Sequence, residues 1–172
     1  VYTDGSFFGT CSGLGVYIEE FQNNTTFKKH YYHQQHSGIR SELIRFERNA
    51  VRLAIQLCES LNLTKINLII DHHLVFRELL DTSSELHQLI DEFFEECRIF
   101  LVFSHIGIIG NEIADRLANS AKELPNSNQL YKTNRFASLK LSGLLKFGVI
   151  LRKTSPIIGE NIIPDHLMYS FK

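Results

Sequence analysis

Four acidic residues occupy places where a carboxylate is unexpected. Asp4 ends a short expected strand at the start of the chain, and Asp71 closes an almost continuous apolar run. Glu47 falls on the apolar face of an expected helix, and Asp115 lies beside the small apolar side chains of the last expected helix. An ionised carboxylate facing a core is costly unless something compensates it. Each acid alone is typical of a turn, a cap or a solvated face, but the four together indicate a chemical site.

Converging carboxylates repel one another, so they either take up protons or hold divalent cations. Oxygen ligands without His or Cys favour Mg²⁺ or Mn²⁺ over zinc. Such a cluster suits phosphoryl hydrolysis with two metal ions about 3.5–4 Å apart, one generating the attacking hydroxide and the other stabilising the leaving 3′ oxygen. We therefore expect two Mg²⁺ ions, with Mn²⁺ as the substitute, at Asp4, Glu47, Asp71 and Asp115.

The first third of the chain reads as three extended segments. Residues 1–4 form a short strand, and Gly5 to Gly13 reads as a turn region rich in small residues. Apolar and other residues alternate over 14–19, the period of a half-buried strand. After the Asn23-Asn24 turn, residues 25–33 are rich in Thr, Phe and Tyr, which favours a second antiparallel strand.

Helical and extended patterns then alternate along the chain. Apolar residues recur at steps of three, four and seven over 43–61, which predicts an amphipathic helix of roughly 20 residues. The almost continuous apolar runs at 65–71 and 99–103 are typical of strands covered on both faces, as in parallel sheets. A capping box at Thr82-Ser83-Ser84-Glu85 opens another helix. The remaining elements are a first helix at 43–61, strands at 65–71 and 99–103, a short helix at 74–80, and a last helix opened by Asn111.

This order predicts an α/β fold. Strands paired first by hairpins and later joined through helices give a five-stranded mixed sheet, three antiparallel strands then two parallel ones, with helices on both faces. If the first and fourth strands are neighbours, Asp4 and Asp71 end side by side at one edge of the sheet.

The net charge of −1 hides two unlike parts. Residues 1–123 hold 11 Lys and Arg against 17 Asp and Glu, whereas residues 124–172 hold 7 against 2 together with all three prolines. We expect a catalytic domain at 1–123 and a basic C-terminal extension at 124–172, partly helical (139–151) or flexible. The extension could attract phosphates or dock as a helix. An acidic core argues against a simple basic-surface nucleic-acid binder.

Cysteine use and hydropathy bear on location. Cys11, Cys58 and Cys97 match no disulfide framework or zinc spacing, so we expect reduced thiols and a cytoplasmic or nuclear protein. No signal peptide and no apolar run near 18 residues is present in the sequence, and no membrane role is expected. We expect a monomer, and the strand at Val1 suggests a fragment of a longer polypeptide.

Several segments together resemble a known family. Residues Tyr2 to Ser6 read Tyr-Thr-Asp-Gly-Ser, and Ala50 lies three positions after Glu47. The segment from Ser104 to Asp115 contains His-x-Gly and then Gly-Asn-Glu-x-Ala-Asp. These residues resemble type 1 ribonucleases H, which have the ribonuclease H fold. They are most similar to the ribonuclease H domains of non-LTR retrotransposon polyproteins. The resemblance covers about residues 1–122.

The resemblance implies roles for individual residues. Asp4, Glu47, Asp71 and Asp115 would bind the metals, with Asp4 and Asp71 nearest both ions. It also implies cleavage of the RNA strand of an RNA/DNA hybrid, leaving 5′-phosphate and 3′-hydroxyl ends, beside the reverse transcriptase of a parent polyprotein. The remaining implied roles are proton transfer and product release for His105, helix capping and site support for Asn111 and Glu112, and close approach of the RNA backbone for Gly5 and Ser6.

The sequence also departs from the family. His72-His73 follow Asp71 where the family usually has Ser, and are either extra metal ligands or solvated side chains. Leu43 and Ile44 stand where some members have Asn residues that touch the DNA strand, and no Lys/Arg-rich protrusion is present in the sequence. Two alternatives stay open, a nuclease of the same fold with another nucleic-acid substrate and a non-catalytic scaffold.

Overall fold

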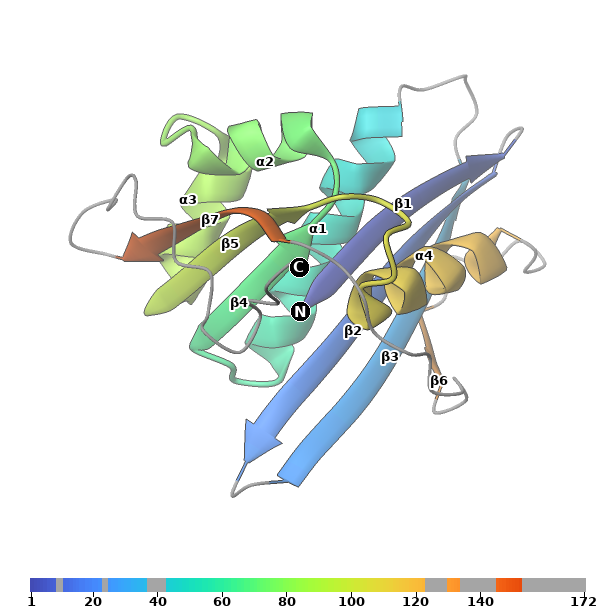
Figure 1. The fold of residues 1–172 in the computed structure, drawn as a ribbon, viewed down its shortest axis with the longest axis horizontal. Coiled ribbons are helices and arrows are strands. Elements are labelled where there is room, and N and C mark those ends of the chain that lie inside the picture. Colours follow the sequence, from blue (N-terminus) through green and yellow to red (C-terminus); the bar gives the residue numbers. More distant parts are fainter. Residues whose placement is uncertain (9–10, 23–24, 37–42, 123–129, 134–144, 153–172) are drawn as a thin grey trace, which may run out of the picture.

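One mixed β-sheet with helices on both faces organises the molecule (Figure 1). The computed structural model describes residues 1–8, 11–22, 25–36, 43–122, 130–133 and 145–152. In these residues the strand order is β6-β3-β2-β1-β4-β5-β7. The strands are β1 (Tyr2–Phe8), β2 (Cys11–Gln22), β3 (Thr25–His36), β4 (Lys65–Ile70), β5 (Glu96–Val102), β6 (Leu130–Thr133) and β7 (Leu145–Arg152), and the helices are α1 (Leu43–Ser60), α2 (His73–Leu80), α3 (Glu85–Phe93) and α4 (Ile109–Ala121).

The expected five-stranded mixed sheet is confirmed at the centre of this order. β1, β2 and β3 pair antiparallel, and β1, β4 and β5 pair parallel. A large apolar cluster between the sheet and the helices α1, α2 and α3 forms the main core. Of the four acids, Asp4 lies in β1 and Asp71 directly follows β4, whereas Glu47 lies in α1 and Asp115 in α4.

The expected turn at Gly5-Ser6 is wrong, because β1 runs on to Phe8. Gly5 pairs with Leu14 and Ser6 with Gly13, so both residues lie inside the ladder with β2. A Cβ on Gly5 would lie 2.5 Å from the backbone nitrogen of Glu47, closer than non-bonded atoms approach. The small residue is needed because a helix packs against the strand backbone, and the chain does not bend there.

The helices cover opposite faces of the sheet (Figure 1). Leu14 packs with Phe46 and Ala50 of α1. A Cβ on the neighbouring Gly15 would lie 2.1 Å from the Ala114 carbonyl oxygen of α4. Successive strand residues point to opposite faces, so α1 and α4 lie on the two sides of β2. Helices on both faces, as expected, let side chains reach the sheet edge from either side.

The helix α3 begins two residues later than the Thr82–Glu85 capping box suggested, because Ser84 and not Thr82 is the N-cap. Ser84 is the N-cap, and its side chain accepts a hydrogen bond from the His87 backbone N–H at 3.1 Å. The Glu85 carboxylate turns instead to Arg52 of α1, 2.7 Å away. A helix starting at Glu85 leaves the N–H of His87 without an intrahelical partner, and the nearest hydroxyl satisfies it. The expected Thr82–Glu85 box is therefore wrong.

Two segments of the basic extension, β6 and β7, form the outermost strands at the two edges of the sheet. β6 pairs antiparallel with β3, and β7 pairs antiparallel with β5. The expected helix at 139–151 is wrong over 145–151, and residues 139–144 lie outside the described part. Gly148 disfavours a helix and the following Val149-Ile150 pair favours a strand. The open edge of β5 also offers unpaired backbone groups that a further strand satisfies.

Two smaller observations concern the cysteines and the helices. Cys58 and Cys97 are free thiols, as expected, and both are buried. Within the described residues, no helix combines the length and the apolar character that a membrane crossing needs.

Candidate active site

The site lies where β1 and β4 part from each other. The two strands pair at Tyr2 and Ile69, and the Val1 carbonyl accepts a hydrogen bond from the Ile69 N–H at 2.8 Å. Asp4 and Asp71 each lie two residues beyond this pair. Equal offsets along parallel strands bring residues to the same edge of a sheet. The expected juxtaposition of the two aspartates is therefore confirmed.

Three of the four expected acids meet at this edge. A carboxylate oxygen from each of Asp4, Glu47 and Asp71 lies within 4.8 Å of those of the others. Asp4 and Glu47 are each only 7% exposed, whereas Asp71 is partly exposed. Glu47 reaches the edge from α1, where the Gly5 backbone N–H donates to its Oε2 at 3.1 Å. We refer to Asp4, Glu47 and Asp71 as the carboxylate trio.

Burial and crowding oppose the ionisation of two trio members. Burial raises the pKa of Asp4, and the charges of Asp71 and Asp115 raise it further. Burial also raises the pKa of Glu47, followed by the charge of Asp4. Lys122 acts in the opposite direction on Asp4, and the Gly5 N–H does so on Glu47, but neither outweighs burial. The trio is therefore stable either with bound protons or with a bound cation.

The donor set fits a hard divalent cation. All three trio members offer carboxylate oxygens, the ligands that Mg²⁺ and Mn²⁺ prefer. Nearby, the Oδ1 atom of Asn111 is buried without a hydrogen-bond partner. Acceptor oxygens thus outnumber donors at this edge, which is the imbalance that a cation with its water shell corrects.

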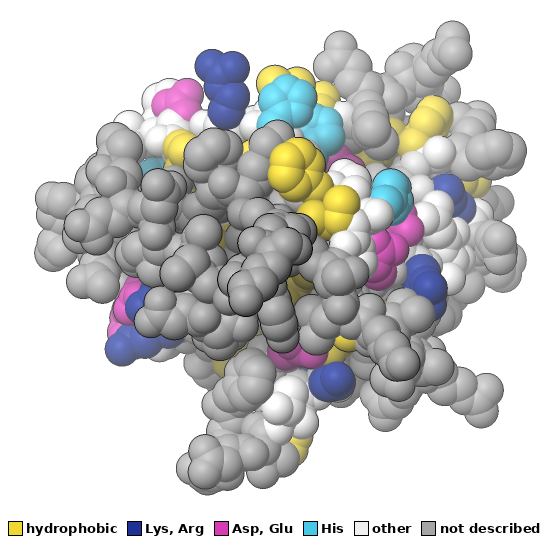
Figure 2. Space-filling view, in the orientation of Figure 1, with side chains coloured by type: hydrophobic (Ala, Val, Ile, Leu, Met, Phe, Trp, Pro, Cys, Tyr) yellow, Lys and Arg dark blue, Asp and Glu magenta, His cyan; other side chains and the backbone are white. Residues whose placement is uncertain are grey.

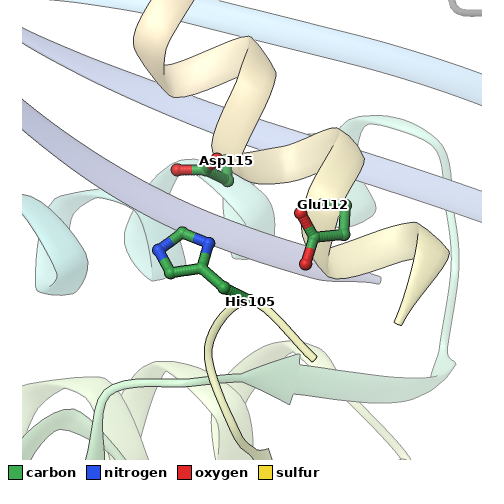
Figure 3. Close-up of side chains that lie close together, drawn as sticks. All are labelled: His105, Glu112 and Asp115. Atoms are coloured by element: carbon green, nitrogen blue, oxygen red, sulfur yellow. The ribbon is translucent and has the colours of Figure 1, made fainter. Parts of the chain in front are cut away.

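The fourth acid, Asp115, belongs to a second group. Asp115 and Glu112 project from α4 toward His105, which lies in the loop after β5 (Figure 3). Ligand atoms of the three residues lie within 4.8 Å of one another. In the space-filling view, acidic and histidine side chains are neighbours on the visible face (Figure 2). The expected set of four therefore divides into the trio and one acid that acts on it through its charge.

His105 is held in an unusual backbone conformation. Its φ angle is 56°, in the left-handed region that favours glycine. The neighbouring Gly107 backbone N–H donates to the Glu112 Oε1 atom at 3.3 Å, which ties this loop to the first turn of α4. The exposed imidazole is thereby presented on the side of Asp115 (Figure 3). Backbone strain of this kind is commonly concentrated at functional sites.

Asn111 does not cap α4, contrary to expectation. The helix begins at Ile109 with Ile108 as its N-cap, which makes no side-chain capping bond. Asn111 is instead 2% exposed, and its Nδ2 donates to the Asp71 Oδ2 atom at 3.0 Å. Its position one turn before Asp115 directs it toward the end of β4 rather than toward the start of its own helix. The residue supports the site through a trio member.

The sequence patterns considered above did not point to one polar residue of this site, Asn119. The Asn119 side chain donates to the Asp115 Oδ1 atom at 2.8 Å and accepts from the Ser6 hydroxyl at 2.8 Å. The available signal was spacing, because residues four apart on a helix are neighbours. A polar residue four positions after a candidate ligand was therefore worth noting.

The His72-His73 pair takes no part in either group. Their rings stack with centroids 5.7 Å apart. Burial lowers the pKa of His72, and its Nδ1 atom is buried without a hydrogen-bond partner, whereas His73 is exposed. Among the described residues, neither joins a set of metal-binding side chains, which favours the alternative in which they are not ligands.

Comparison with known proteins agrees with the fold. The strand order β3-β2-β1-β4-β5, with helices on both faces, defines a ribonuclease H-like α/β fold. The chain is similar to a solved structure, ribonuclease H1 from the halophilic archaeon Halobacterium salinarum NRC-1. The TM-score is 0.52 at 22% identity, covering 70% of this chain and 93% of that one. No protein-family profile and no curated sequence matches the chain.

Proposed function

We propose that this chain is a ribonuclease H, a metal-dependent endonuclease that cleaves the RNA strand of RNA/DNA hybrids. The observation that carries the proposal is the trio of carboxylates within 4.8 Å, supplied by β1, α1 and the end of β4 of a ribonuclease H-like fold. Because a fold hosts many functions, we infer the activity from the site and from the Gly-Asn-Glu-x-Ala-Asp segment that ends at Asp115.

The trio and Asp115 would hold two divalent cations, Mg²⁺ or Mn²⁺. Such ions supply a water of lowered pKa and stabilise negative charge on the leaving oxygen. The chain's own part is to keep its carboxylates in place. The Gly5 N–H holds Glu47, and the Asn111 amide holds Asp71, so these two carboxylates would be kept oriented for a bound cation.

We assign phosphodiester hydrolysis to this site, and the acids and the histidine gathered there support that assignment. Water attacks the phosphorus and gives up a proton, the bond from phosphorus to the 3′ oxygen breaks, and that oxygen takes up a proton. The products are a 5′-phosphate and a 3′-hydroxyl. His105 is the residue we assign to proton transfer, because histidine suits this task near neutral pH and this side chain is exposed beside Asp115.

Substrate choice requires contact with 2′-hydroxyls across a minor groove. We assign this contact to the backbone around Gly5 and Ser6. Beyond the Tyr2–Ile69 pair, no strand of the described residues pairs with β1 on its β4 side, so we infer that a nucleic-acid backbone approaches there. The side of Gly5 that faces α1 is filled by the helix backbone, which leaves the strand edge as the approach.

We also propose a biological setting. The segment from Ser104 to Asp115 resembles non-LTR retrotransposon polyproteins, so residues 1–123 would act beside a reverse transcriptase in a reducing, cytoplasmic or nuclear compartment. The free thiols of Cys58 and Cys97 are compatible with that setting. In this proposal the domain acts as a monomer, and the basic residues of 124–172 attract the phosphate backbone.

The test is a cleavage assay with end-labelled RNA/DNA hybrid, double-stranded RNA and double-stranded DNA in Mg²⁺. We expect cuts only in the RNA of the hybrid, abolished by EDTA. Asp4→Asn should lower the rate by on the order of 10²–10³, the size of loss seen when one group that supports the transition state is removed, because the variant loses a charged metal ligand. Glu59→Gln, at an exposed position near the end of α1, is the matched control and should cleave normally.

Three outcomes would contradict the proposal. Cleavage of another substrate but not the hybrid would assign a different nuclease activity to the site. Binding of the hybrid without any Mg²⁺-dependent cut would favour a scaffold. An Asp4→Asn variant that fails to fold would show that the acid is structural, and a thermal melt run beside each assay detects this.

A further inference from the structure

We propose that Asn119 is a positioning residue that holds the Asp115 carboxylate and connects it to the strand that carries Asp4. This inference rests on the proposed function, because it assigns Asp115 to the metal-binding set. No expectation from the sequence pointed to Asn119, which lies in the second half of α4 (Ile109–Ala121).

The Asn119 amide uses all of its hydrogen-bonding capacity. Its Nδ2 donates to the Asp115 Oδ1 at 2.8 Å and to the Asp115 backbone carbonyl at 2.9 Å. Its Oδ1 accepts from the Ser6 hydroxyl at 2.8 Å and from the Lys122 ammonium at 2.6 Å. An amide offers two N–H groups and one oxygen with two lone pairs, so no group is left over.

The chemistry of these partners determines which way the amide points. A reversed amide would set its oxygen against the Asp115 carboxylate and its NH₂ group against the Lys122 ammonium. Both contacts would be repulsive, so the assignment of nitrogen and oxygen follows from the network itself. The orientation in which Asn119 donates to Asp115 is the one that its neighbours permit.

The network joins two elements of the site. Ser6 lies in β1 two residues after Asp4, and Asn119 lies one helical turn after Asp115. Among the described residues, Asn119 is the one that donates a hydrogen bond to the Asp115 carboxylate. The hydrogen bonds from Ser6 to Asn119 and from Asn119 to Asp115 therefore fix the position of the Asp115 carboxylate relative to β1, the strand that carries Asp4.

A neutral amide suits this task better than a cationic side chain. It holds one carboxylate oxygen without cancelling the charge that a metal needs. Because Oδ1 of Asp115 is the atom engaged by Asn119, Oδ2 is left for a cation. The same arrangement occurs at Asp71, where Asn111 donates to Oδ2. The two acids that burial constrains least are thus each held by an asparagine of α4.

Isothermal titration of the full chain with MnCl₂, without substrate, tests the inference. Losing an outer partner of a metal-binding side chain typically costs about 10- to 100-fold in metal affinity, and we expect this loss for Asn119→Ala. Asn119→Asp has the same shape and still accepts from Ser6 and Lys122, but it cannot donate to Asp115. It should therefore be impaired at least as much as Asn119→Ala. Ser120→Ala, at the exposed neighbouring position, is the matched control.

A double-mutant cycle with Asp115→Asn separates positioning from a general effect on the fold. In the Asp115→Asn background, Asn119→Ala should weaken Mn²⁺ binding no further. An equal additional loss would overturn the inference, as would wild-type Mn²⁺ affinity in Asn119→Ala or a wild-type chain that binds no Mn²⁺. A wild type that binds Mn²⁺ with the expected variant pattern but cuts no hybrid would sink the proposed function and leave the positioning role intact.

Discussion

The Gly5 backbone N–H donates to the Glu47 carboxylate across 3.1 Å, and the same glycine brings β1 and α1 into backbone contact. A Cβ at this position would lie 2.5 Å from both the Glu47 nitrogen and the Phe46 carbonyl carbon. Gly5, the residue next to Asp4, therefore determines how close α1 and its Glu47 lie to β1. Site geometry and helix packing depend on one absent side chain.

Gly5→Ala should damage both stability and activity. Because the added methyl meets backbone atoms rather than a flexible side-chain end, α1 must move away from β1. Overpacking of this kind costs about 1–3 kcal/mol, and we expect that decrease in the free energy of urea unfolding. Hybrid cleavage should fall at least about tenfold, since sub-ångström misplacement of catalytic groups is costly. Thr26→Ala, exposed in β3, is the control. Wild-type values for Gly5→Ala would show that β1 and α1 can separate freely.

Local periodicity predicted the acids well. Asp71 was placed at a strand end because a buried apolar run stops there, and Glu47 was placed on an apolar face because its helix has a regular stripe. Both inferences use neighbours within a few residues of the acid. The equal spacing of Asp4 and Asp71 from the Tyr2–Ile69 pair then brings the two strands' acids together.

Non-local pairing decided what periodicity could not. Gly5-Ser6 has the composition of a turn, yet its pairing with Gly13-Leu14 makes it a strand. The segment from Leu145 to Leu151 is apolar enough for a helix, but it lies along β5, about fifty residues earlier in the chain. Asn119 depends on Ser6, more than a hundred residues away. No local pattern carries such partners.

The metal-free protein should lose stability as the pH rises. Burial and neighbouring charge raise the pKa of Asp4 from 3.8 to about 8 and that of Glu47 from 4.5 to about 9. Between the lower and the upper values, the folded chain keeps protons that the unfolded chain has released. Unfolded molecules then bind fewer protons than folded ones, so the free energy of unfolding falls with increasing pH.

Thermal melts in EDTA and in Mg²⁺ at pH 5 and pH 8 measure this effect. The Tm gain from Mg²⁺ should be larger at pH 8, where the cation replaces protons that the site has begun to lose. In EDTA, Asp4→Asn should flatten the decline between the two pH values, because one of the two titrating groups is gone. An equal decline in the variant and the wild type would show that these carboxyls do not control it.

The N-cap of α3 can be located by two substitutions. Ser84→Ala removes the acceptor for the His87 N–H and the hydroxyl that donates to the Glu78 carbonyl at 2.7 Å. Loss of such a cap costs about 1 kcal/mol of unfolding free energy, measured by urea titration. Thr82→Ala, at an exposed position, should stay within about 0.5 kcal/mol of the wild type. A larger cost for Thr82→Ala would restore the capping box expected from the sequence.

His105→Gly should lower the rate of hybrid cleavage without lowering the free energy of unfolding. A positive φ costs a non-glycine residue roughly 1–2 kcal/mol of conformational free energy. His105, with a φ of 56°, carries this cost. Glycine removes that cost, although it also gains freedom in the unfolded chain, so we expect an unfolding free energy equal to or slightly above the wild type. Asn62→Gly is the matched control, with a φ of 55° and an exposed side chain.

The two glycine variants should differ in rate. A positioned proton-transfer group typically contributes about 10²- to 10⁴-fold, so we expect a fall of at least about 10²-fold in kcat for His105→Gly and none for Asn62→Gly. Added imidazole should restore part of the rate in the first variant, because the vacated space beside Asp115 accepts a free ring. A wild-type kcat in His105→Gly would mean that the left-handed conformation serves the loop alone. A loss that imidazole does not relieve, accompanied by slow product dissociation, would move the role of His105 from proton transfer to product release.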